Sequence, residues 1–280
     1  MAIQIITDST SDIGREEAEK MGVTIVPLKV LFGEKEYREG IEITMDDFYQ
    51  KLARAEKLPT TSQPAPDDFL GHFQKAKEVG DSVIVLLIAG KFSGTTQSAV
   101  IAKEIAEYDA IYIIDSLTAI TGLRLLVEHA VKLREQHWEA EKIVAALEKS
   151  KDRIVLMAMV DTLEYLHKGG RLSKSSAVLG SLLRFKPILS VKDGVIGVVG
   201  KARGTNKGIA RMLEIMEEMG EIDPAYPVTF GYTAEDSKGL LLKEKVTEKY
   251  NLGETAIYPV GCVVGTHVGP GACVITYIRK

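Results

Sequence analysis

The sequence predicts an α/β protein of two domains: an N-terminal α/β/α domain on a parallel sheet and a C-terminal α/β domain on a mixed sheet. Short apolar segments alternate with helical segments through the first half, a pattern typical of a parallel sheet covered on both faces. In the second half, Asp193-Gly194 separates two strand segments and indicates a hairpin. We expect the domains to span residues 1–152 and 153–280.

The first domain is expected to alternate strands and helices in order. The run VIVLLI at residues 83–88 is too short to cross a membrane and is typical of a strand buried on both faces. The predicted strands cover residues 2–6, 23–30, 82–88 and 110–114. The predicted helices cover residues 14–20, 46–54, 67–79, 96–107, 117–136 and 139–152.

The second domain is expected to combine hairpins with helices on one face of its sheet. Its predicted strands cover residues 153–159, 187–192, 195–200, 226–232, 255–260 and 272–278. Its predicted helices cover residues 206–220 and 237–249.

Composition excludes several classes of protein. With 45% hydrophobic and 26% charged residues, the chain is expected to be soluble and globular, and its net charge of −4 gives no electrostatic footprint for nucleic acid. The N-terminus MAIQIITDST lacks a basic region and a long apolar core, so we expect no signal peptide. Without an export signal or a CxxC motif, Cys262 and Cys273 are expected to be free thiols in the cytoplasm.

The segment AGKFSGTTQSA, residues 89–99, closes a predicted strand and opens a predicted helix. Gly90 and Gly94 flank Ser93, which places a small hydroxyl beside helix N–H groups that have no partner within the helix. Such a site can receive an anionic group at the carboxyl end of a buried strand. A capped turn that binds nothing is the alternative.

Two further segments favour a ligand site. PTTSQPAPDD, residues 59–68, is a polar turn with two prolines, and GCVVGTHVGPGAC, residues 261–273, is expected to be a glycine-rich hairpin around His267. Hydrogen bonds from Ser93, Thr61 and His267 would suit a carboxylate or an acyl phosphate.

Catalysis by Ser93 is the competing interpretation. His267 would then be its base, but AGKFSGT lacks the G-x-S-x-G spacing of a hydrolase, and no third orienting acid is evident. Asp8 and Asp115 follow predicted strands and could bind magnesium, yet capping is the favoured role. The sequence has no phosphate-binding loop, no kinase signature and no clustered metal ligands.

Six segments together resemble the DegV family of bacterial lipid-binding proteins. In chain order they are IITDSTSDI (5–13), TSQPAPDDF (61–69), FSGTTQSA (92–99), IDSLTAITG (114–122), LEYLHKGGRLS (163–173) and GTHVGPGA (265–272). The resemblance implies two different α/β domains with a fatty acid held between them. It also implies a carrier, without catalytic activity or cofactor, that presents a long-chain fatty acid to a separate kinase subunit.

The resemblance also implies where the ligand is held. The fatty-acid carboxylate would contact Thr61 and Ser93, with His267 close by, and the acyl chain would fill an apolar tunnel. We expect the remaining ligand contacts from neighbouring residues of the same segments: Ser62, Gly94, Thr95 and Thr266.

Four cations flank glycine-containing turns and form a possible rim for an acidic partner: Lys168, Arg171, Lys201 and Arg203. A solvated basic surface is the alternative. Residues 175–185, SSAVLGSLLRF, fit a core-facing helix or a mobile lid over the acyl chain that touches a membrane during exchange. A serine esterase or thioesterase, a small-molecule kinase, and a phosphate- or sugar-binding regulator remain the alternative functions.

Overall fold

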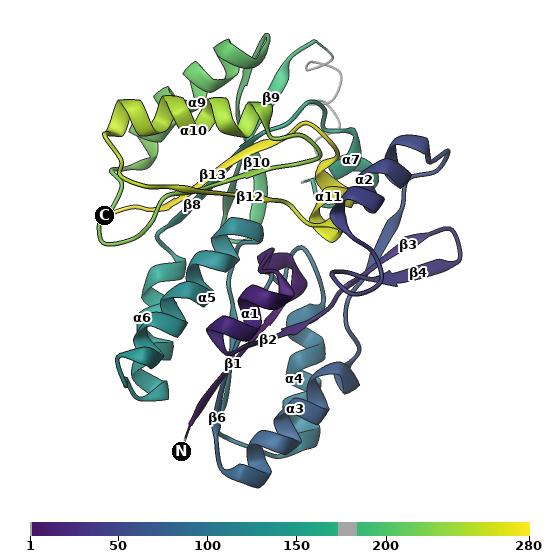
Figure 1. Cartoon of the computed structure of the whole chain (residues 1–280), viewed down its shortest axis with the longest axis vertical. Helices are drawn as coiled ribbons and strands as arrows, with labels where there is room; N and C mark the ends of the chain where they lie inside the picture. The colour runs from purple at the N-terminus through teal and green to yellow at the C-terminus, as the bar shows by residue number, and fades with distance from the viewer. Residues whose placement is uncertain (1, 173–183) are drawn as a thin grey trace.

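The computed structural model describes residues 2–172 and 184–280, and within them the chain forms three β-sheets (Figure 1). A four-stranded parallel sheet with its helices occupies the lower part of the view in Figure 1, and a six-stranded mixed sheet occupies the upper part. The predicted α/β class is confirmed. The strands of the parallel sheet precede residue 152 and those of the mixed sheet follow residue 153, whereas the domain boundary itself stays a prediction.

The parallel sheet has the order β2-β1-β6-β7. Its strands are β1 (Ile3–Asp8), β2 (Val23–Val26), β6 (Ser82–Leu87) and β7 (Ile111–Asp115). All six residues of the central β6 are buried, as the unbroken apolar run predicts, because helices cover both faces. One face packs against α3 (Pro66–Val79) and α4 (Thr95–Ala106), and the other against α1 (Arg15–Met21), α5 (Ile120–Glu135) and α6 (Ala140–Lys151).

The mixed sheet has the order β10-β9-β8-β13-β11-β12. Its strands are β8 (Ile154–Met159), β9 (Lys186–Lys192), β10 (Val195–Ala202), β11 (Thr229–Tyr232), β12 (Ala256–Pro259) and β13 (Cys273–Ile278). The predicted Asp193-Gly194 hairpin is confirmed, since Lys192 and Val195 pair directly across it. The helices α9 (Thr205–Met219) and α10 (Ser237–Tyr250) pack on one face, and the other face turns toward the parallel sheet.

A small antiparallel sheet, in the order β4-β3-β5, was not predicted. It consists of β3 (Lys29–Phe32), β4 (Lys35–Arg38) and β5 (Thr60–Ser62), with α2 (Met45–Arg54) beside it. The single strand predicted at residues 23–30 was wrong: the chain leaves the parallel sheet after Val26, where Pro27 lacks the N–H that a continuing strand needs. The segment predicted as a polar turn contributes β5.

The glycine-rich hairpin predicted around His267 was also wrong. Residues Cys262–Val268 form the short helix α11, and the turn follows it at Gly269 and Gly271, where φ is +75° and +81°. Gly265 lies inside this helix. A side chain at this position would be crowded, because a β-carbon there would lie 2.6 Å from the hydroxyl of Tyr49. The glycine thus allows α11 to pack closely on α2.

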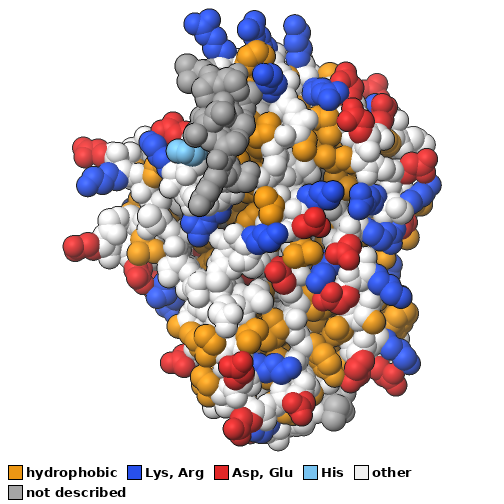
Figure 2. Space-filling view, turned by 180° about the vertical axis from the view of Figure 1, so that it is seen from behind, with side chains coloured by type: hydrophobic (Ala, Val, Ile, Leu, Met, Phe, Trp, Pro, Cys, Tyr) orange, Lys and Arg blue, Asp and Glu red, His pale blue; other side chains and the backbone are white. Residues whose placement is uncertain are grey.

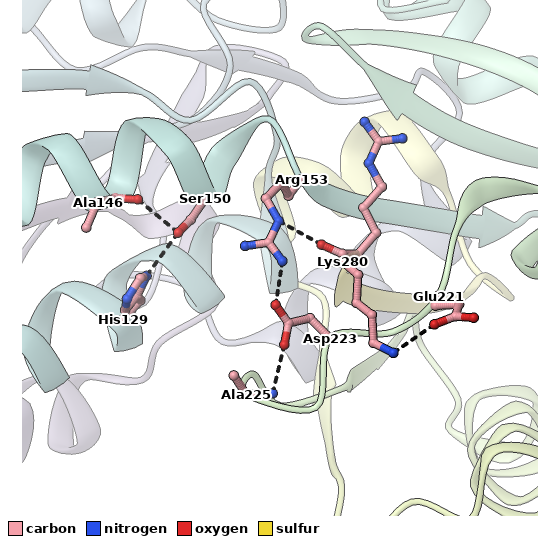
Figure 3. A network of polar contacts seen from close by, with 9 residues as sticks. His129, Ala146, Ser150, Arg153, Glu221, Asp223, Ala225 and Lys280 are labelled. Atoms are coloured by element: carbon pink, nitrogen blue, oxygen red, sulfur yellow. Dashed lines mark hydrogen bonds and ion pairs between the residues drawn. The ribbon is translucent and has the colours of Figure 1, made fainter.

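Two groups of polar contacts lie on either side of the connection from α6 to β8 (Figure 3). Arg153, at the start of β8, donates to the carboxylate of Asp223, and its Nε donates to the Arg279 carbonyl at 2.8 Å. On α6, Ser150 donates to the Ala146 carbonyl at 2.9 Å and contacts His129 of α5. Polar contacts therefore line the connection between α6 and the mixed sheet.

None of the helices in residues 2–172 and 184–280 is long and apolar enough to cross a membrane. Of the possible lid at residues 175–185, residues 175–183 lie outside the described part of the chain.

Candidate functional site

A cavity of about 330 Å³ lies where the carboxyl end of the parallel sheet meets the mixed sheet. Its walls are mainly apolar and come from both parts of the chain, for example Ile88 after β6, Leu156 and Ala158 on β8, and Val274 on β13. Its polar lining includes Thr61, Ser62, Gln63, Ser93, Arg171 and His267. The cavity is therefore an apolar chamber with hydrogen-bonding groups gathered in part of its lining.

Thr61 and His267 meet at this lining although they are 206 residues apart. Pairing of Thr61 with Val30 places the threonine on β5, and α11 carries His267 against it, with Thr61 Oγ1 and His267 Nε2 2.8 Å apart. Burial, assisted by the positive charge of Arg171, lowers the pKa of His267 to about 4. The imidazole is therefore neutral at physiological pH.

The second imidazole nitrogen is also informative. His267 Nδ1 is buried and has no hydrogen-bond partner among the described residues. Gly169 packs against it so closely that a β-carbon on that glycine would lie 2.2 Å from Nδ1. Most buried polar atoms in proteins have a hydrogen-bond partner, so this nitrogen has bonding capacity left for a ligand or a water molecule.

Ser93 stands in the loop between β6 and α4, and its Oγ lies 2.8 Å from Thr95 Oγ1. Asp115, at the end of β7, holds this loop, because both of its oxygens accept from the Gly90 N–H at 3.1 Å. Asp115 also accepts from the Leu117 N–H, and Asp8 accepts from the Thr10 N–H as the N-cap of the short helix η1 (Ser9–Ser11). The capping role predicted for Asp8 is confirmed, and Asp115 fastens loops.

Gln63 is a lining residue that sequence reasoning missed. Its Nε2 donates to Ser98 Oγ of α4 at 2.9 Å, which ties β5 to the Ser93 loop. Gly94 lies against its amide, because a β-carbon at Gly94 would lie 2.0 Å from Gln63 Oε1 and would displace that side chain. The available indication was its position inside the TSQP segment, between Thr61 and the following proline.

The other predicted ligand contacts divide into two groups. Ser62 and Gly94 line the cavity, and their contact with a ligand stays a prediction. Thr95 and Thr266 do not contribute to the lining: Thr95 is fully buried against Ser93, and the Thr266 hydroxyl donates to the Cys262 carbonyl on its own helix at 2.8 Å.

The four predicted rim cations occupy different environments. Arg171 lines the cavity and donates to the carbonyls of Phe92 and Gly169 at 3.1 and 2.6 Å. Lys168 is the last residue of α7 (Glu164–Lys168), where its exposed side chain pairs with Glu164. Lys201 and Arg203 lie over the ring of Phe185, 5.0 and 4.8 Å from its centroid. Arg171 is thus part of the cavity wall. Figure 2 shows a group of Lys and Arg side chains at the upper end of the molecule.

The structure also addresses metals and thiols. Within residues 2–172 and 184–280, no group of three or more His, Cys, Asp or Glu side chains is arranged to hold a metal ion. Cys262 and Cys273 are buried free thiols, as predicted, and burial raises the pKa of Cys273 to about 12.

Comparisons with known proteins agree with this architecture. The family model described as "Uncharacterised protein, DegV family" matches residues 2–280. A DegV domain-containing protein of Caldanaerobacter subterraneus is 35% identical over 280 residues, covering 99% of both chains.

Two solved structures share the fold over nearly the whole chain. A DegV family protein from Thermus thermophilus, described as fatty-acid binding, gives a TM-score of 0.91 at 33% identity over 99% of this chain and 100% of that one. A stearic-acid-binding protein from Eubacterium ventriosum gives a TM-score of 0.90 at 31% identity over 100% of this chain and 99% of that one. The chain belongs to the DegV family.

Proposed function

We propose that this protein binds a long-chain fatty acid, with the carboxylate at Thr61, Ser93 and His267 and the acyl chain in the apolar cavity. The observation that carries the proposal is the lining itself: hydroxyl groups and a neutral imidazole in an otherwise apolar chamber. A volume of about 330 Å³ lies within the range of small-molecule sites. The fatty-acid-binding relatives from Thermus thermophilus and Eubacterium ventriosum support the same ligand class.

The pair formed by Thr61 and His267 suits a carboxylate. With Nε2 protonated, His267 donates to Thr61 Oγ1, and the hydroxyl proton of Thr61 is then available to the ligand. Ser93 supplies a second hydroxyl, which exchanges its contact with Thr95 for one with the ligand. Both donors are neutral, and Arg171, whose guanidinium donates to two carbonyls, adds a favourable positive field.

The acyl chain supplies most of the affinity. Burying a dozen methylenes contributes on the order of 10 kcal/mol before opposing terms, at about 0.8 kcal/mol per CH₂. Each hydrogen bond to the carboxylate contributes about 1.5–3 kcal/mol before the cost of dehydrating the anion. The apolar walls therefore set retention, and the polar lining sets which end of the ligand is held there.

We further propose that the protein is a cytoplasmic carrier that presents the carboxylate to a partner kinase subunit, without catalysis of its own. Among the rim cations we assign Lys201 and Arg203 to an acidic partner, because Arg171 is committed to the cavity wall and Lys168 already pairs with Glu164. The esterase alternative requires His267 to contact Ser93, whereas His267 is paired with Thr61 and Ser93 with Thr95. This pairing favours binding over acyl transfer.

Extraction of the purified protein with organic solvent, followed by mass spectrometry, tests the proposal. We expect about one long-chain fatty acid per protein chain, and uptake of added palmitate by delipidated protein. Absence of extracted lipid together with failure to take up palmitate or oleate would contradict the proposal. Labelling of Ser93 by a fluorophosphonate, with turnover of an acyl thioester, would favour the esterase instead.

A further inference from the structure

Three residues in the cavity wall are fastened by their backbone N–H groups to polar side chains behind the wall. They are Leu28, Ile88 and Val263, which come from three separate segments and all line the cavity. Their N–H groups donate to two side-chain carboxyl groups and to a serine hydroxyl, which is itself hydrogen-bonded to one of those carboxyl groups. Buried backbone donors rarely go unpaired, so these acceptors help to define where the wall stands.

Asp8 holds the segment that leads to Ser93. Its Oδ2 accepts from the Ile88 N–H at 2.7 Å, and its Oδ1 accepts from the N–H and the hydroxyl of Thr10 at 2.9 and 2.5 Å. The Asp8 side chain is completely buried at the end of β1. Its carboxyl therefore joins β1 to the loop that follows β6.

Glu39 holds the other two wall residues. Its Oε1 accepts from the Val263 N–H of α11 at 2.8 Å, and its Oε2 accepts from Ser9 Oγ at 2.5 Å. Ser9 Oγ in turn accepts from the Leu28 N–H at 3.0 Å. Glu39 is 7% exposed, so these bonds form away from solvent.

Asp12 completes the group by approaching the same end of α11. Its Oδ1 accepts from the Gly261 N–H at 3.0 Å, and Oδ2 is buried without a partner among the described residues. A β-carbon on Gly261 would lie 2.5 Å from Glu39 Oε1 and 2.8 Å from Asp12 Oδ1, so the two carboxyls converge there. We refer to Asp8, Asp12 and Glu39 as the carboxyl cluster.

Few positive charges face the carboxyl cluster, so negative charge on its acids is weakly balanced. Arg124 of α5 is buried nearby, but its guanidinium donates to the Asp12 backbone carbonyl and pairs with Glu17 and Glu128. Among the described residues, Tyr49 of α2 and Cys262 of α11 also interact with the cluster. A second cavity, which Asp12 and Glu39 help to line, is lined as well by Arg15, Glu19, Glu42 and Asp47.

Burial disfavours the ionised carboxylates. It raises the pKa of Asp8 to about 6 and that of Glu39 to about 7, and burial together with Glu39 raises the pKa of Asp12 well above its usual value. The stabilisation from these neutral carboxyls is complete at low pH and is lost as pH rises through about 6 and about 7.

We propose that the carboxyl cluster positions the walls of the fatty-acid cavity and that its ionisation loosens them, so that release of the fatty acid speeds up as pH rises. The inference rests on the proposed fatty-acid function. The second cavity, of about 610 Å³, is lined by Asp12, Glu39 and Gly261 and gives protons a path to the cluster. Ionisation of Glu39 places a buried negative charge beside the Asp12 carboxyl at the start of α11, the helix that carries His267.

The experiment measures release of carboxyl-¹³C palmitate into excess phosphatidylcholine vesicles between pH 5.5 and 8. His267 stays neutral throughout this range, so its titration does not change the release rate between pH 5.5 and 8. Wild-type release is expected to accelerate about tenfold, the factor that corresponds to one pKa unit of differential stabilisation. Glu39→Gln cannot ionise and resembles the protonated carboxyl: its carbonyl accepts from the Val263 N–H as before, whereas its amide donates to Ser9 Oγ, which reverses the direction of that one hydrogen bond.

Glu39→Gln is expected to remove the step near pH 7 and to keep the step of Asp8 near pH 6. Glu42→Gln is the matched control, because Glu42 also lines the second cavity but pairs with Arg38 at the surface. It should keep the wild-type profile. A wild-type profile in Glu39→Gln, or a flat profile in the wild type, would overturn the proposal.

Amide hydrogen exchange of residues 261–268 in delipidated protein separates this inference from the function on which it rests. After correction for the intrinsic exchange rate, protection of this segment should decrease as pH rises in the wild type, and should decrease less in Glu39→Gln. If palmitate fails to bind but this difference is seen, the fatty-acid function fails while the positioning role holds. Equal protection at all pH values in the wild type contradicts the positioning role whatever the ligand.

Discussion

Two polar clusters lie on opposite sides of the same cavity wall and use their hydrogen-bonding capacity differently. The first, here called the head-group cluster, comprises Thr61, Ser93 and His267 and faces the cavity. Its members contact other side chains, and His267 Nδ1 has no partner among the described residues. In the carboxyl cluster behind the wall, most oxygens accept from backbone N–H groups.

This difference separates binding from positioning. A side chain that holds a backbone N–H cannot be released without leaving a buried donor unpaired, whereas a hydroxyl paired with another hydroxyl can exchange that partner for a ligand. The head-group cluster is therefore suited to bind and release, and the carboxyl cluster is suited to hold the wall.

The largest effect is expected from Asp8→Ala, which removes the acceptor for the N–H groups of Thr10 and Ile88. Two buried donors are left unpaired, so the free energy of unfolding should fall by about 3 kcal/mol. Urea denaturation at pH 5.5 measures it. Asp81→Ala is the control, because Asp81 also accepts a backbone N–H but is exposed to solvent. Equal stability of the two variants would show that Asp8 does not hold the wall.

A smaller effect, on binding alone, is expected from Thr61→Val. The variant keeps the shape of the side chain but loses the hydroxyl between His267 and the ligand, so palmitate affinity should fall about tenfold, or about 1.4 kcal/mol. Equilibrium titration of delipidated protein measures the change. Thr266→Val, on the same helix as His267 but outside the cavity lining, should bind as the wild type does. Equal loss in both variants would argue against a direct role for Thr61.

The smallest effect on lipid binding is expected from the double reversal Lys201→Glu and Arg203→Glu. Both cations lie over Phe185, so palmitate affinity should stay within about twofold of the wild type. Association with a partner kinase subunit should slow at low salt, because charge complementarity chiefly speeds encounter. The double reversal Lys245→Glu and Lys249→Glu, on α10, changes the net charge by the same amount and serves as the control. If lipid affinity falls instead, the two cations belong to the cavity and not to a docking surface.

The fold was predictable where periodicity carried the information. The apolar run of β6 indicated a buried parallel strand, and Asp193-Gly194 indicated the β9–β10 turn. The small sheet was not predictable because its pairing joins β3 to β5 through tertiary contact. The break in residues 23–30 did have a signal, since Pro27 lacks the N–H that a continuing strand needs. Gly265 contributed to the wrong prediction of a hairpin around His267, because glycine occurs both in tight turns and where helices pack closely.

The candidate site was predictable in its hydroxyls and histidine, because Ser93 and Thr61 follow local patterns of loops and helix starts. Gln63 has no such pattern, and its role depends on the approach of α4. The carboxyl cluster was hidden for a related reason: Asp8 does cap a helix, and Glu39 lies in a polar segment whose burial follows from the packing of α11.

The contact between Thr61 and His267 also has a consequence for biosynthesis. Synthesis proceeds from the N-terminus, so β5 leaves the ribosome about 200 residues before α11 does, and the Ser93 loop about 170 residues before it. Until that last helix docks, the chamber lacks both its imidazole and the wall formed by Val263, and water reaches its apolar surface. If the protein binds fatty acid as proposed, a nascent chain whose α11 has not yet docked lacks a complete site for it.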